Sequence, residues 1–318
     1  MFLVAYKPGQ LANQLFLFAH LAAFAAEHGL TVVNPSFDDY CGHFEVLDRD
    51  LFCRFPARKS LIAPTPFRRQ RLYEAVNRWT LRFTRRMTLV PRGAALLNTE
   101  YAAFCFMNEA PFQKLVSENR LVVIRGWCFR DLAAFRRHAH TLRRFFAPKA
   151  AAAANVAAFI QSCRNGADLL VGVHIRRGDY REFKAGRYFF EPEQYAALMR
   201  QMERLFPGRR VRFLVCSNEA VSEAAFPGLD VRPGPGHIIE DLYSLAECDY
   251  LFGPPSTYSQ WASFYGEVPL YKILDPALAL SLDAFRVADG DCDFPEFFAS
   301  CPRWGKEGAP PAVLDRVC

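Results

Sequence analysis

The feature that most constrains the fold of this chain is an apolar run that ends in a cluster of charge. Residues 169–173 are aliphatic apart from one glycine, so they predict a strand that is buried on both faces. Polar and charged side chains then follow within six residues: His174, Arg176, Arg177 and Asp179. Because ligands of open α/β sheets bind at the carboxyl ends of the strands, we expect these side chains to face a ligand.

The two adjacent arginines indicate the chemistry of that ligand. The guanidinium groups of Arg176 and Arg177 stay charged at any working pH, and each donates several hydrogen bonds, which suits a diphosphate. The simpler alternative is a surface arginine pair that forms salt bridges with Asp179. The residues alone leave both interpretations open.

Strand and helix patterns alternate twice along the chain. The first half opens with a strand, a helix over residues 11–28 and a second strand, and the pattern restarts at residue 169. Such alternation predicts an α/β fold with parallel sheets. We therefore expect two Rossmann-like domains that face each other across a cleft, with residues 1–150 in the first and 151–318 in the second. The loop after the first strand lacks G-x-G-x-x-G, so a dinucleotide fingerprint is absent.

Two further predicted strands of the second half also end in polar side chains. Ser217 and Glu219 follow one of them, and Ser256 and Thr257 follow the other. The carboxyl ends of parallel strands share one edge of a sheet, so we expect these groups to lie near Arg176. Ser256 and Thr257 are also typical helix N-caps, and a helix N-terminus can be capped and bind an anion at the same time.

Two more polar positions are candidates for this site. Asp241 follows Ile238 and Ile239, so it is either a helix N-cap or a carboxylate at a strand end, where it would accept two N–H bonds from a purine such as guanine. Asn13 and Gln14 follow the first predicted turn, and we expect them to face the cleft from the first domain. An amide pair at a helix start is the equally plain alternative.

Residues 67–88 predict a basic amphipathic helix. Apolar side chains recur there at helical spacing, and arginines lie away from that stripe. Between Arg58 and Arg92 there are ten Lys or Arg residues and one acid, Glu74. The net charge of this segment, 10 − 1 = +9, exceeds the net charge of +6 of the whole chain. Such a helix is typical of contact with an anionic membrane or another polyanion, and a solvated surface is the equal alternative. Our hypothesis is that this face touches anionic lipid near a lipid-linked acceptor.

Cysteine spacing and hydropathy indicate where the protein works. The ten cysteines form no Cys-x-x-Cys pair, which argues against a zinc ribbon or a thioredoxin-like site, and we expect mostly buried or free thiols of a reducing compartment. The chain begins directly with a strand-like run and shows no signal-peptide pattern. No apolar stretch reaches about 18 residues. We expect a cytoplasmic protein, with any membrane contact peripheral at the inner face.

Three segments together resemble a known enzyme family. They read Gly9-x-Leu11-Ala12-Asn13-Gln14, His174-x-Arg176-Arg177-x-Asp179-Tyr180, and Asp241-Leu242 through Ser256-Thr257-Tyr258-Ser259. This set resembles the bacterial α-1,2-fucosyltransferases of glycosyltransferase family 11 and, more distantly, the α-1,6- and protein O-fucosyltransferases. The resemblance spans residues 3 to about 265.

The resemblance implies a fold, a reaction and a donor. We expect a GT-B arrangement and an inverting transfer of fucose from GDP-fucose to a hydroxyl of a glycan, with no metal or other cofactor. The most specific expectation is a galactoside α-1,2-fucosyltransferase of surface polysaccharide synthesis. The partners would then be the GDP-sugar and a glycan acceptor that is carried on a lipid.

The resemblance also implies roles for individual residues. Arg176 would hold the β-phosphate, and His174 and Asp241 would face the guanine. Asn13 would approach the donor sugar or the acceptor. Asp179 is a candidate general base, although it could equally orient an arginine. The remaining donor-binding candidates are Arg177, Ser217, Glu219, Ser256 and Thr257.

Two other functions compete with this one. A metal-dependent GT-A transferase needs an Asp-x-Asp triplet, and the chain has such triplets at residues 48–50, 289–291 and 291–293, which we interpret as turn acids. A non-catalytic protein that binds sugar nucleotides or polyanions would use the basic helix. Nucleic-acid binding is disfavoured, because the basic residues are not interleaved with stacking aromatic side chains.

Overall fold

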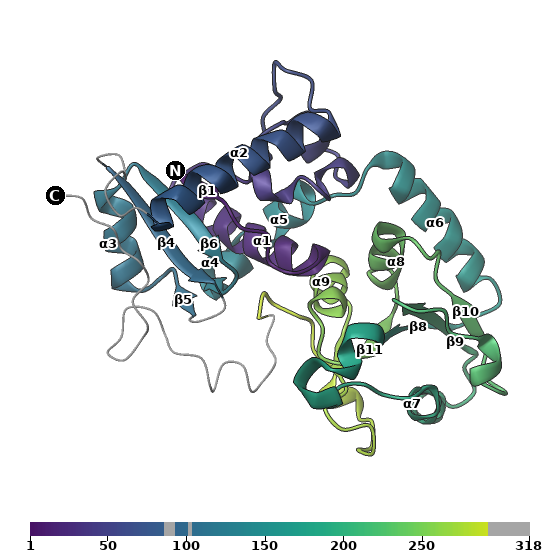
Figure 1. Ribbon diagram of the computed structural model, residues 1–318. Helices are drawn as coiled ribbons and strands as arrows, with labels where there is room; N and C mark the ends of the chain where they lie inside the picture. The colour runs from purple at the N-terminus through teal and green to yellow at the C-terminus, as the bar shows by residue number, and fades with distance from the viewer. Residues whose placement is uncertain (86–92, 101–103, 292–318) are drawn as a thin grey trace. The chain divides into compact units, whose positions relative to one another are not determined.

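The computed structural model describes residues 1–85, 93–100 and 104–291. Over this part the chain divides into two compact units, one ending at Lys149 and one beginning at Ala150. Each unit contains a five-stranded, mainly parallel sheet with helices packed on it (Figure 1). The predicted α/β fold class is therefore confirmed.

The sheet of the first unit has the strand order β3-β2-β1-β6-β4. Neighbouring strands run parallel except for the short edge strand β3, which is antiparallel to β2. A separate two-stranded sheet pairs β5 with β7. The strands of this unit are β1 (Phe2–Val4), β2 (Val32–Val33), β3 (Arg54–Phe55), β4 (Ala94–Glu100), β5 (Cys105–Phe106), β6 (Leu121–Gly126) and β7 (Phe129–Arg130).

Helix α1 (Leu11–Glu27) forms the centre of the first unit. It is apolar around most of its circumference and correspondingly buried, as expected for a helix inside a core. Its end agrees with the prediction, because Gly29 adopts φ +62° just beyond it. The other helical segments are α2 (Pro66–Arg85), α3 (Ala110–Glu118), α4 (Leu132–Arg137), α5 (Ala139–Phe145) and the 3₁₀ turns η1 (Pro35–Phe37), η2 (Cys41–His43) and η3 (Leu47–Arg49).

The segment over residues 131–146 forms two helices and not one, because α4 and α5 meet at a break at His138. Asp131 is the N-cap and accepts a hydrogen bond from Ala134 N at 2.9 Å. The ring of His138 lies 2.8 Å from Glu27 Oε2 at the end of α1. This contact is with a residue distant in sequence, so helical periodicity could not indicate it.

The basic helix predicted over residues 67–88 corresponds to α2, and residues 86–88 lie outside the described part of the chain. Its apolar stripe packs on the sheet of the first unit: Val76 and Trp79 lie against a core of Ala5, Leu96 and Val123. The periodicity therefore identified the face of the helix that turns inward.

The second unit has a fully parallel sheet in the order β10-β9-β8-β11-β12. Its helix α7 covers one face, and α6 and α8 cover the other (Figure 1). The strands are β8 (Leu169–Ile175), β9 (Val211–Ser217), β10 (Val231–Pro233), β11 (Tyr250–Gly253) and β12 (Leu270–Lys272). The helical segments are α6 (Ala150–Arg164), α7 (Pro192–Leu205), α8 (Ile238–Leu245), α9 (Thr257–Gly266), and the 3₁₀ turns η4 (Gly178–Arg181), η5 (Phe183–Gly186), η6 (Glu223–Ala225) and η7 (Leu282–Ala284).

The central strand β8 is buried along its whole length, as predicted. Gly172 is required there, because a Cβ at this position would come within 2.3 Å of Leu251 Cδ2. The strand runs two residues further than predicted, since His174 pairs with Cys216 and Ile175 with Ser217 on β9. His174 therefore lies inside the strand and not in the loop after it.

The strand order places a topological switch point between β8 and β11. From β8 the chain proceeds outward through β9 and β10, and then returns to β11 on the opposite side. Loops that leave two strands in opposite directions open a crevice at their carboxyl ends, and ligands of such folds bind there. Among the helices that the structure describes, no segment has the length and hydropathy of a membrane span.

Candidate active site in the second unit

The loops that follow β9, β8 and β11 meet at one edge of the sheet and are bonded to one another. The backbone N–H of Arg177, after β8, donates to Asn218 Oδ1, after β9, at 2.7 Å. The hydroxyl of Tyr180 donates to the carbonyl oxygen of Pro255, after β11, at 2.7 Å. The predicted meeting of the three strand ends is thus confirmed, and side-chain hydrogen bonds fix their spacing.

Arg176 is held by a carboxylate three residues away. Its Nη2 lies 2.8 Å from Asp179 Oδ1 and 2.9 Å from Oδ2. The guanidinium carbon is 5.5 Å from the ring centroid of Tyr180. The Arg176 side chain is 15% exposed and that of Asp179 is 59% exposed. Of the two roles considered for Asp179, this contact fits that of a positioning residue for Arg176.

Arg177 is compensated by two carboxylates and not one. Its Nη1 lies 3.1 Å from Glu191 Oε2, and its Nε lies 3.3 Å from Glu219 Oε2. The guanidinium also stacks 4.6 Å from the ring centroid of Phe189. Arg177 therefore fits the alternative of a salt-bridged surface arginine, but its partners are Glu191 and Glu219 and not Asp179. One carboxylate oxygen of Glu219 is occupied by this salt bridge.

His174 lies near the end of β8, before the loop that carries Arg176 and Arg177, and the residue is 4% exposed. Its ring packs 5.2 Å from the ring centroid of Tyr258. Burial, reinforced by the charge of Arg176, lowers the pKa of His174 to about 3, so the imidazole is neutral at physiological pH. Its buried Nδ1 has no hydrogen-bond partner within the described residues.

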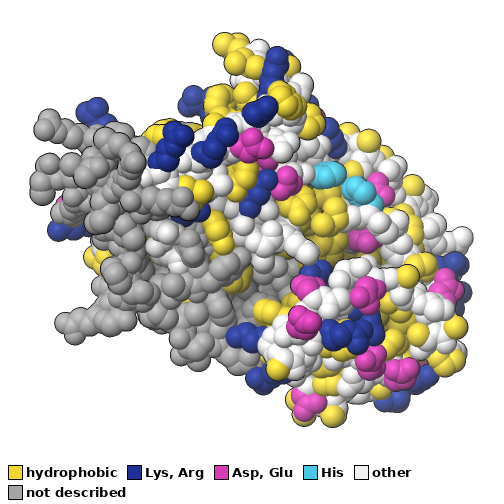
Figure 2. Space-filling model, in the orientation of Figure 1, with side chains coloured by type: hydrophobic (Ala, Val, Ile, Leu, Met, Phe, Trp, Pro, Cys, Tyr) yellow, Lys and Arg dark blue, Asp and Glu magenta, His cyan; other side chains and the backbone are white. Residues whose placement is uncertain are grey.

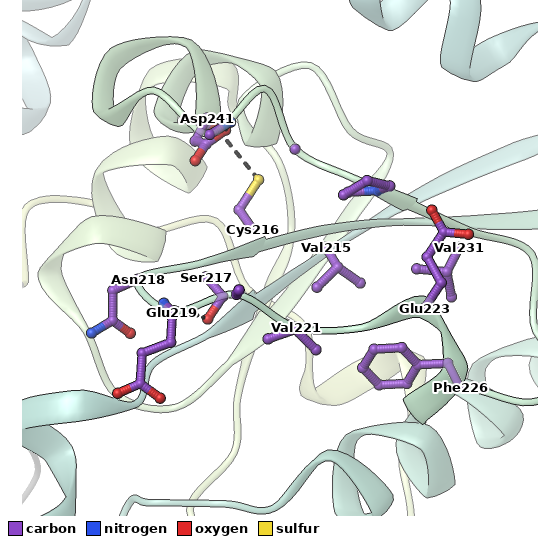
Figure 3. Close-up of a pocket in the computed structure, with 14 residues that line it drawn as sticks. Val215, Cys216, Ser217, Asn218, Glu219, Val221, Glu223, Phe226, Val231 and Asp241 are labelled. Carbon is purple, nitrogen blue, oxygen red and sulfur yellow. Dashed lines mark hydrogen bonds between the residues drawn. The ribbon is translucent and has the colours of Figure 1, made fainter.

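A pocket of about 430 Å³ opens beside these loops. It lies between the end of β9, the glycine turn after β10 and the start of α8 (Figure 3). Of the residues predicted for the site, Ser217, Glu219 and Asp241 line it. Figure 3 shows Asp241 and Cys216 at one end, with Ser217 and Glu219 further along the wall.

Asp241 is buried at one end of this pocket. Its Oδ1 accepts a hydrogen bond from Gly236 N at 2.9 Å, and burial raises the pKa of its carboxyl above the usual value. The placement of Asp241 at a strand end or as an N-cap is wrong: His237 caps α8, and Ile238 and Ile239 are its first helical residues. The turn over residues 234–236 separates β10 from the helix, so Asp241 points back from within the first turn of α8.

The N-terminus of α9 lies at the switch point, just after β11. Ser256 is its N-cap, as predicted, and accepts a hydrogen bond from Tyr258 N at 3.3 Å. Thr257 is the first helical residue and not a cap. A helix N-terminus presents backbone N–H groups and a partial positive charge, which favour an anion.

Asn13 belongs to the first unit, where it lies in the first turn of α1. It is packed against the preceding turn, because a Cβ on Gly9 would come within 2.3 Å of Asn13 Nδ2. The sequence prediction missed an ionic cluster after β1 of the same unit: Lys7 Nζ lies 2.7 Å from both Asp38 and Asp39. The adjacent acids Asp38 and Asp39 were its only sequence signal.

Three residues that shape the second-unit site were also missed as site residues. Asn218 and Tyr180 join the loops, and Gly234 gives Asp241 its room, because a Cβ there would lie 2.7 Å from Asp241 Oδ1. The Pro-Gly-Pro-Gly run at residues 233–236 was the available signal for a sharp turn.

The first Asp-x-Asp triplet is committed to ion pairs within the first unit. Asp48 lies 3.4 Å from Arg69 and 2.6 Å from Lys149, and Asp50 lies 2.8 Å from Arg54. The third triplet extends to Asp293, which lies outside the described residues. No group of three or more His, Cys, Asp and Glu side chains among residues that the structure describes is arranged to hold a metal ion.

The fold matches solved glycosyltransferase structures at low sequence identity. A FUT1 mutant from Arabidopsis thaliana in complex with GDP aligns with a TM-score of 0.58 and 14% identity, over 90% of this chain and 73% of that chain. The fucosyltransferase NodZ from Bradyrhizobium aligns with a TM-score of 0.53 and 16% identity, over 87% of this chain and 96% of that chain. The α-1,6-fucosyltransferase NodZ soaked with GDP-fucose aligns with a TM-score of 0.51 and 17% identity, over 89% of this chain and 96% of that chain.

These alignments confirm the predicted GT-B-like fold with two parallel sheets. At such identities they establish the fold alone. No protein-family model matches the sequence, and no curated protein matches it either.

Proposed function

We propose that this chain is an inverting fucosyltransferase that moves fucose from GDP-fucose to a glycan hydroxyl without a metal ion. The observation that carries the proposal is Arg176, fixed by Asp179 at the switch point of a GT-B-like fold. The fold neighbours that were solved with GDP or GDP-fucose support the choice of donor. The GT-A alternative does not fit this fold.

The guanine base is proposed to occupy the pocket lined by Asp241 and Ser217. One oxygen of Asp241 already accepts from Gly236, so the other would accept the N–H groups of the purine edge. The neutral His174 ring lies beside Arg176 and Tyr258, where its Nδ1, which has no partner among the described residues, would take a polar group of the nucleotide.

The diphosphate is proposed to bind between Arg176 and the N-terminus of α9. Departure of GDP leaves negative charge on the β-phosphate, and fixed donors that meet this charge lower the barrier. Arg176 supplies a full charge, while Ser256 and Thr257 supply hydroxyls beside helix amides. Arg177 and Glu219 would hold the loop in place, because their charges already satisfy each other.

The first unit is proposed to bind the acceptor, with Asn13 near the reacting hydroxyl. We propose a galactoside as the acceptor, an α-1,2 linkage as the product, and surface polysaccharide synthesis as the setting. This finer assignment follows from the family resemblance of the sequence motifs. The cluster of Lys7, Asp38 and Asp39 adds charged hydrogen-bonding groups suited to sugar hydroxyls.

A donor screen tests the proposal. The protein is incubated with GDP-fucose, GDP-mannose or UDP-sugars, with and without a β-galactoside, and nucleotide release and thermal shift are measured. We expect GDP release only with GDP-fucose plus acceptor, unchanged by EDTA. GDP at about 100 times its Kd should stabilise the fold by about 2.7 kcal/mol. Stabilisation without turnover would instead favour a binding protein, and loss of turnover in EDTA would contradict the metal-free mechanism.

A further inference from the structure

Helix α2 and the loop before it form a surface that the proposed transfer chemistry does not use. Leu61 is fully exposed, and Ile62 and Phe67 are 55% and 65% exposed. These three large apolar side chains lie close together in sequence: Leu61 and Ile62 are on the loop before α2 (Figure 1), and Phe67 is in the first turn of the helix. We call this cluster the apolar tip. An exposed apolar group of this kind commonly marks an interaction site.

Basic side chains flank the apolar tip. Arg58 and Lys59 precede it, and Arg71 follows it, all of them exposed. Figure 2 shows Lys and Arg side chains around the hydrophobic atoms at the top of the view and along α2. Glu74 is the one acidic residue in the sequence from 58 to 82. The surface is therefore apolar at its end and strongly cationic around it.

The exposed face of α2 continues this positive charge. Arg71, Arg78 and Arg82 are all exposed and share one face at helical spacing. The apolar stripe with Val76 and Trp79 faces the sheet core instead. The helix thus cannot lay its apolar stripe on a membrane, and the apolar tip is the part that remains for insertion.

The loop before α2, which carries Leu61 and Ile62 of the apolar tip, is anchored at both ends. Ser60 Oγ donates to Asp50 Oδ1 at 2.6 Å, and Arg68 Nη1 donates to the Ala63 carbonyl at 3.1 Å. Arg69 is buried and donates to the Asp48 carbonyl at 2.6 Å, which ties the start of α2 to the first unit. Leu61 and Ile62 are therefore exposed on a loop whose two ends are fixed by hydrogen bonds.

We propose that residues 58–71 dock the protein on an anionic lipid bilayer. Leu61, Ile62 and Phe67 enter the interface, and the flanking Arg and Lys side chains meet the lipid headgroups. Apolar side chains gain by leaving water, and each basic residue near an anionic surface adds to the attraction. A nucleic acid would satisfy the charge but offers no apolar layer for two aliphatic side chains. The inference goes beyond the proposed transfer reaction and does not depend on it.

Vesicle flotation tests the proposal directly. The full chain is mixed with phosphatidylcholine vesicles that either contain or lack phosphatidylglycerol, at low and high salt. We expect flotation only with phosphatidylglycerol, and weaker flotation at high salt. Equal flotation with both vesicle types, or none with either, would overturn the proposal.

Two pairs of substitutions separate insertion from charge. Leu61→Asn with Ile62→Asn should weaken binding by about tenfold or more, because the apolar contribution is lost. Arg58→Ser with Lys59→Ser should weaken it by about fivefold per residue at low salt. All four side chains are at the surface, so the variants should keep the thermal stability of the wild type.

Matched controls come from exposed positions of the second unit. Leu278→Asn with Leu282→Asn, and Arg204→Ser with Arg209→Ser, should float like the wild type. A folded Leu61→Asn/Ile62→Asn variant that binds as tightly as the wild type would refute insertion and leave a simple polyanion surface.

A fluorescence measurement locates the apolar tip in the bilayer. Leu61→Trp should show a blue shift with anionic vesicles and quenching by brominated lipid, and Leu278→Trp should show neither. GDP release with a water-soluble acceptor should be unchanged in every variant. Membrane docking and sugar transfer can therefore fail separately, and each result bears on only one of them.

Discussion

Arg176 and Arg177 are adjacent in sequence, but their surroundings differ. Arg176 contacts Asp179 on its own loop, whereas Arg177 bridges Glu191 and Glu219 from two other segments. A cation already bound by two carboxylates has less attraction left for a phosphate. We therefore assign the phosphate contact to Arg176 and the organisation of the loop to Arg177.

Substitution of the two arginines should separate these roles. Arg176→Ala should lower kcat by about 100- to 1,000-fold with little change in Tm, because a fixed donor to the leaving diphosphate is lost. Arg177→Ala should instead lower the free energy of unfolding by about 1 kcal/mol and affect activity less, since its ion pairs are partly exposed. Steady-state GDP release and thermal denaturation measure both effects. Arg204→Ala, on the exposed end of α7, is the control for the loss of an arginine. Near-normal turnover of a folded Arg176→Ala variant would contradict the assignment.

His174 should make stability depend on pH in a predictable direction. Its pKa is about 3 in the folded chain, against about 6.5 when unfolded. Between these values the unfolded state binds more protons, so the free energy of unfolding falls as the pH falls. This group contributes a slope of at most about 1.4 kcal/mol per pH unit. Urea unfolding from about pH 7.5 to 4.5 should show the slope in the wild type and a smaller one in His174→Asn. Equal slopes would mean that His174 is charged or exposed in the folded chain.

At the scale of elements, the pattern of apolar residues predicted the strand and the helix whose burial it determines directly. The aliphatic run of β8 and the 3.6-residue stripe of α2 were both recognised, because burial leaves a direct mark on residue type. Strand β10 was missed, since Val231–Pro233 is a three-residue edge strand with only one half-buried apolar side chain. Its presence depends on pairing with β9, which the sequence does not display.

The errors at the site have the same origin. His174 was predicted to follow β8, but its pairing with Cys216 extends the strand by two residues. Asp241 was expected either as a helix N-cap or at a strand end after Ile238 and Ile239, whereas His237 caps α8 and Asp241 lies within its first turn. The identities of the candidate residues were readable from the motifs. Their surroundings were set by contacts between segments distant in sequence.

The turn between β10 and α8 should control access to the pocket lined by Asp241 and Ser217, in which the guanine base is proposed to bind. In Gly234→Ala the new Cβ would lie 2.7 Å from both Asp241 Oδ1 and Cys216 Sγ, so Asp241 must move. We expect GDP affinity to fall by about tenfold, by analogy with the loss of about 1 to 3 kcal/mol on overpacking a core. Gly42→Ala is the matched control, because its Cβ would have contacts no closer than 3.8 Å. Calorimetric titration with GDP compares the two, and unchanged affinity in Gly234→Ala would place the base elsewhere.

At the scale of the whole molecule, the chain consists of two units with the same architecture and different chemistry. The candidate donor groups lie at the switch point of the second sheet, whereas Asn13 and the Lys7 cluster follow β1 of the first. The first unit also carries the apolar tip and its basic residues. Donor binding should therefore be a property of the second unit, and acceptor and membrane contact properties of the first.

Hydrogen exchange with and without GDP tests this division. Ligand binding slows exchange at amides that it shields or whose opening it suppresses. We expect protection in four segments of the second unit: residues 174–181, 217–219, 234–241 and 254–258. The helix α3 and the loop over residues 58–65 in the first unit should exchange unchanged. Arg176→Ala should reduce protection over residues 254–258 more than over residues 234–241, because it weakens the diphosphate contact and spares the base. Protection centred on the first unit would show that the nucleotide binds there, and the assignment of the donor site would then be wrong.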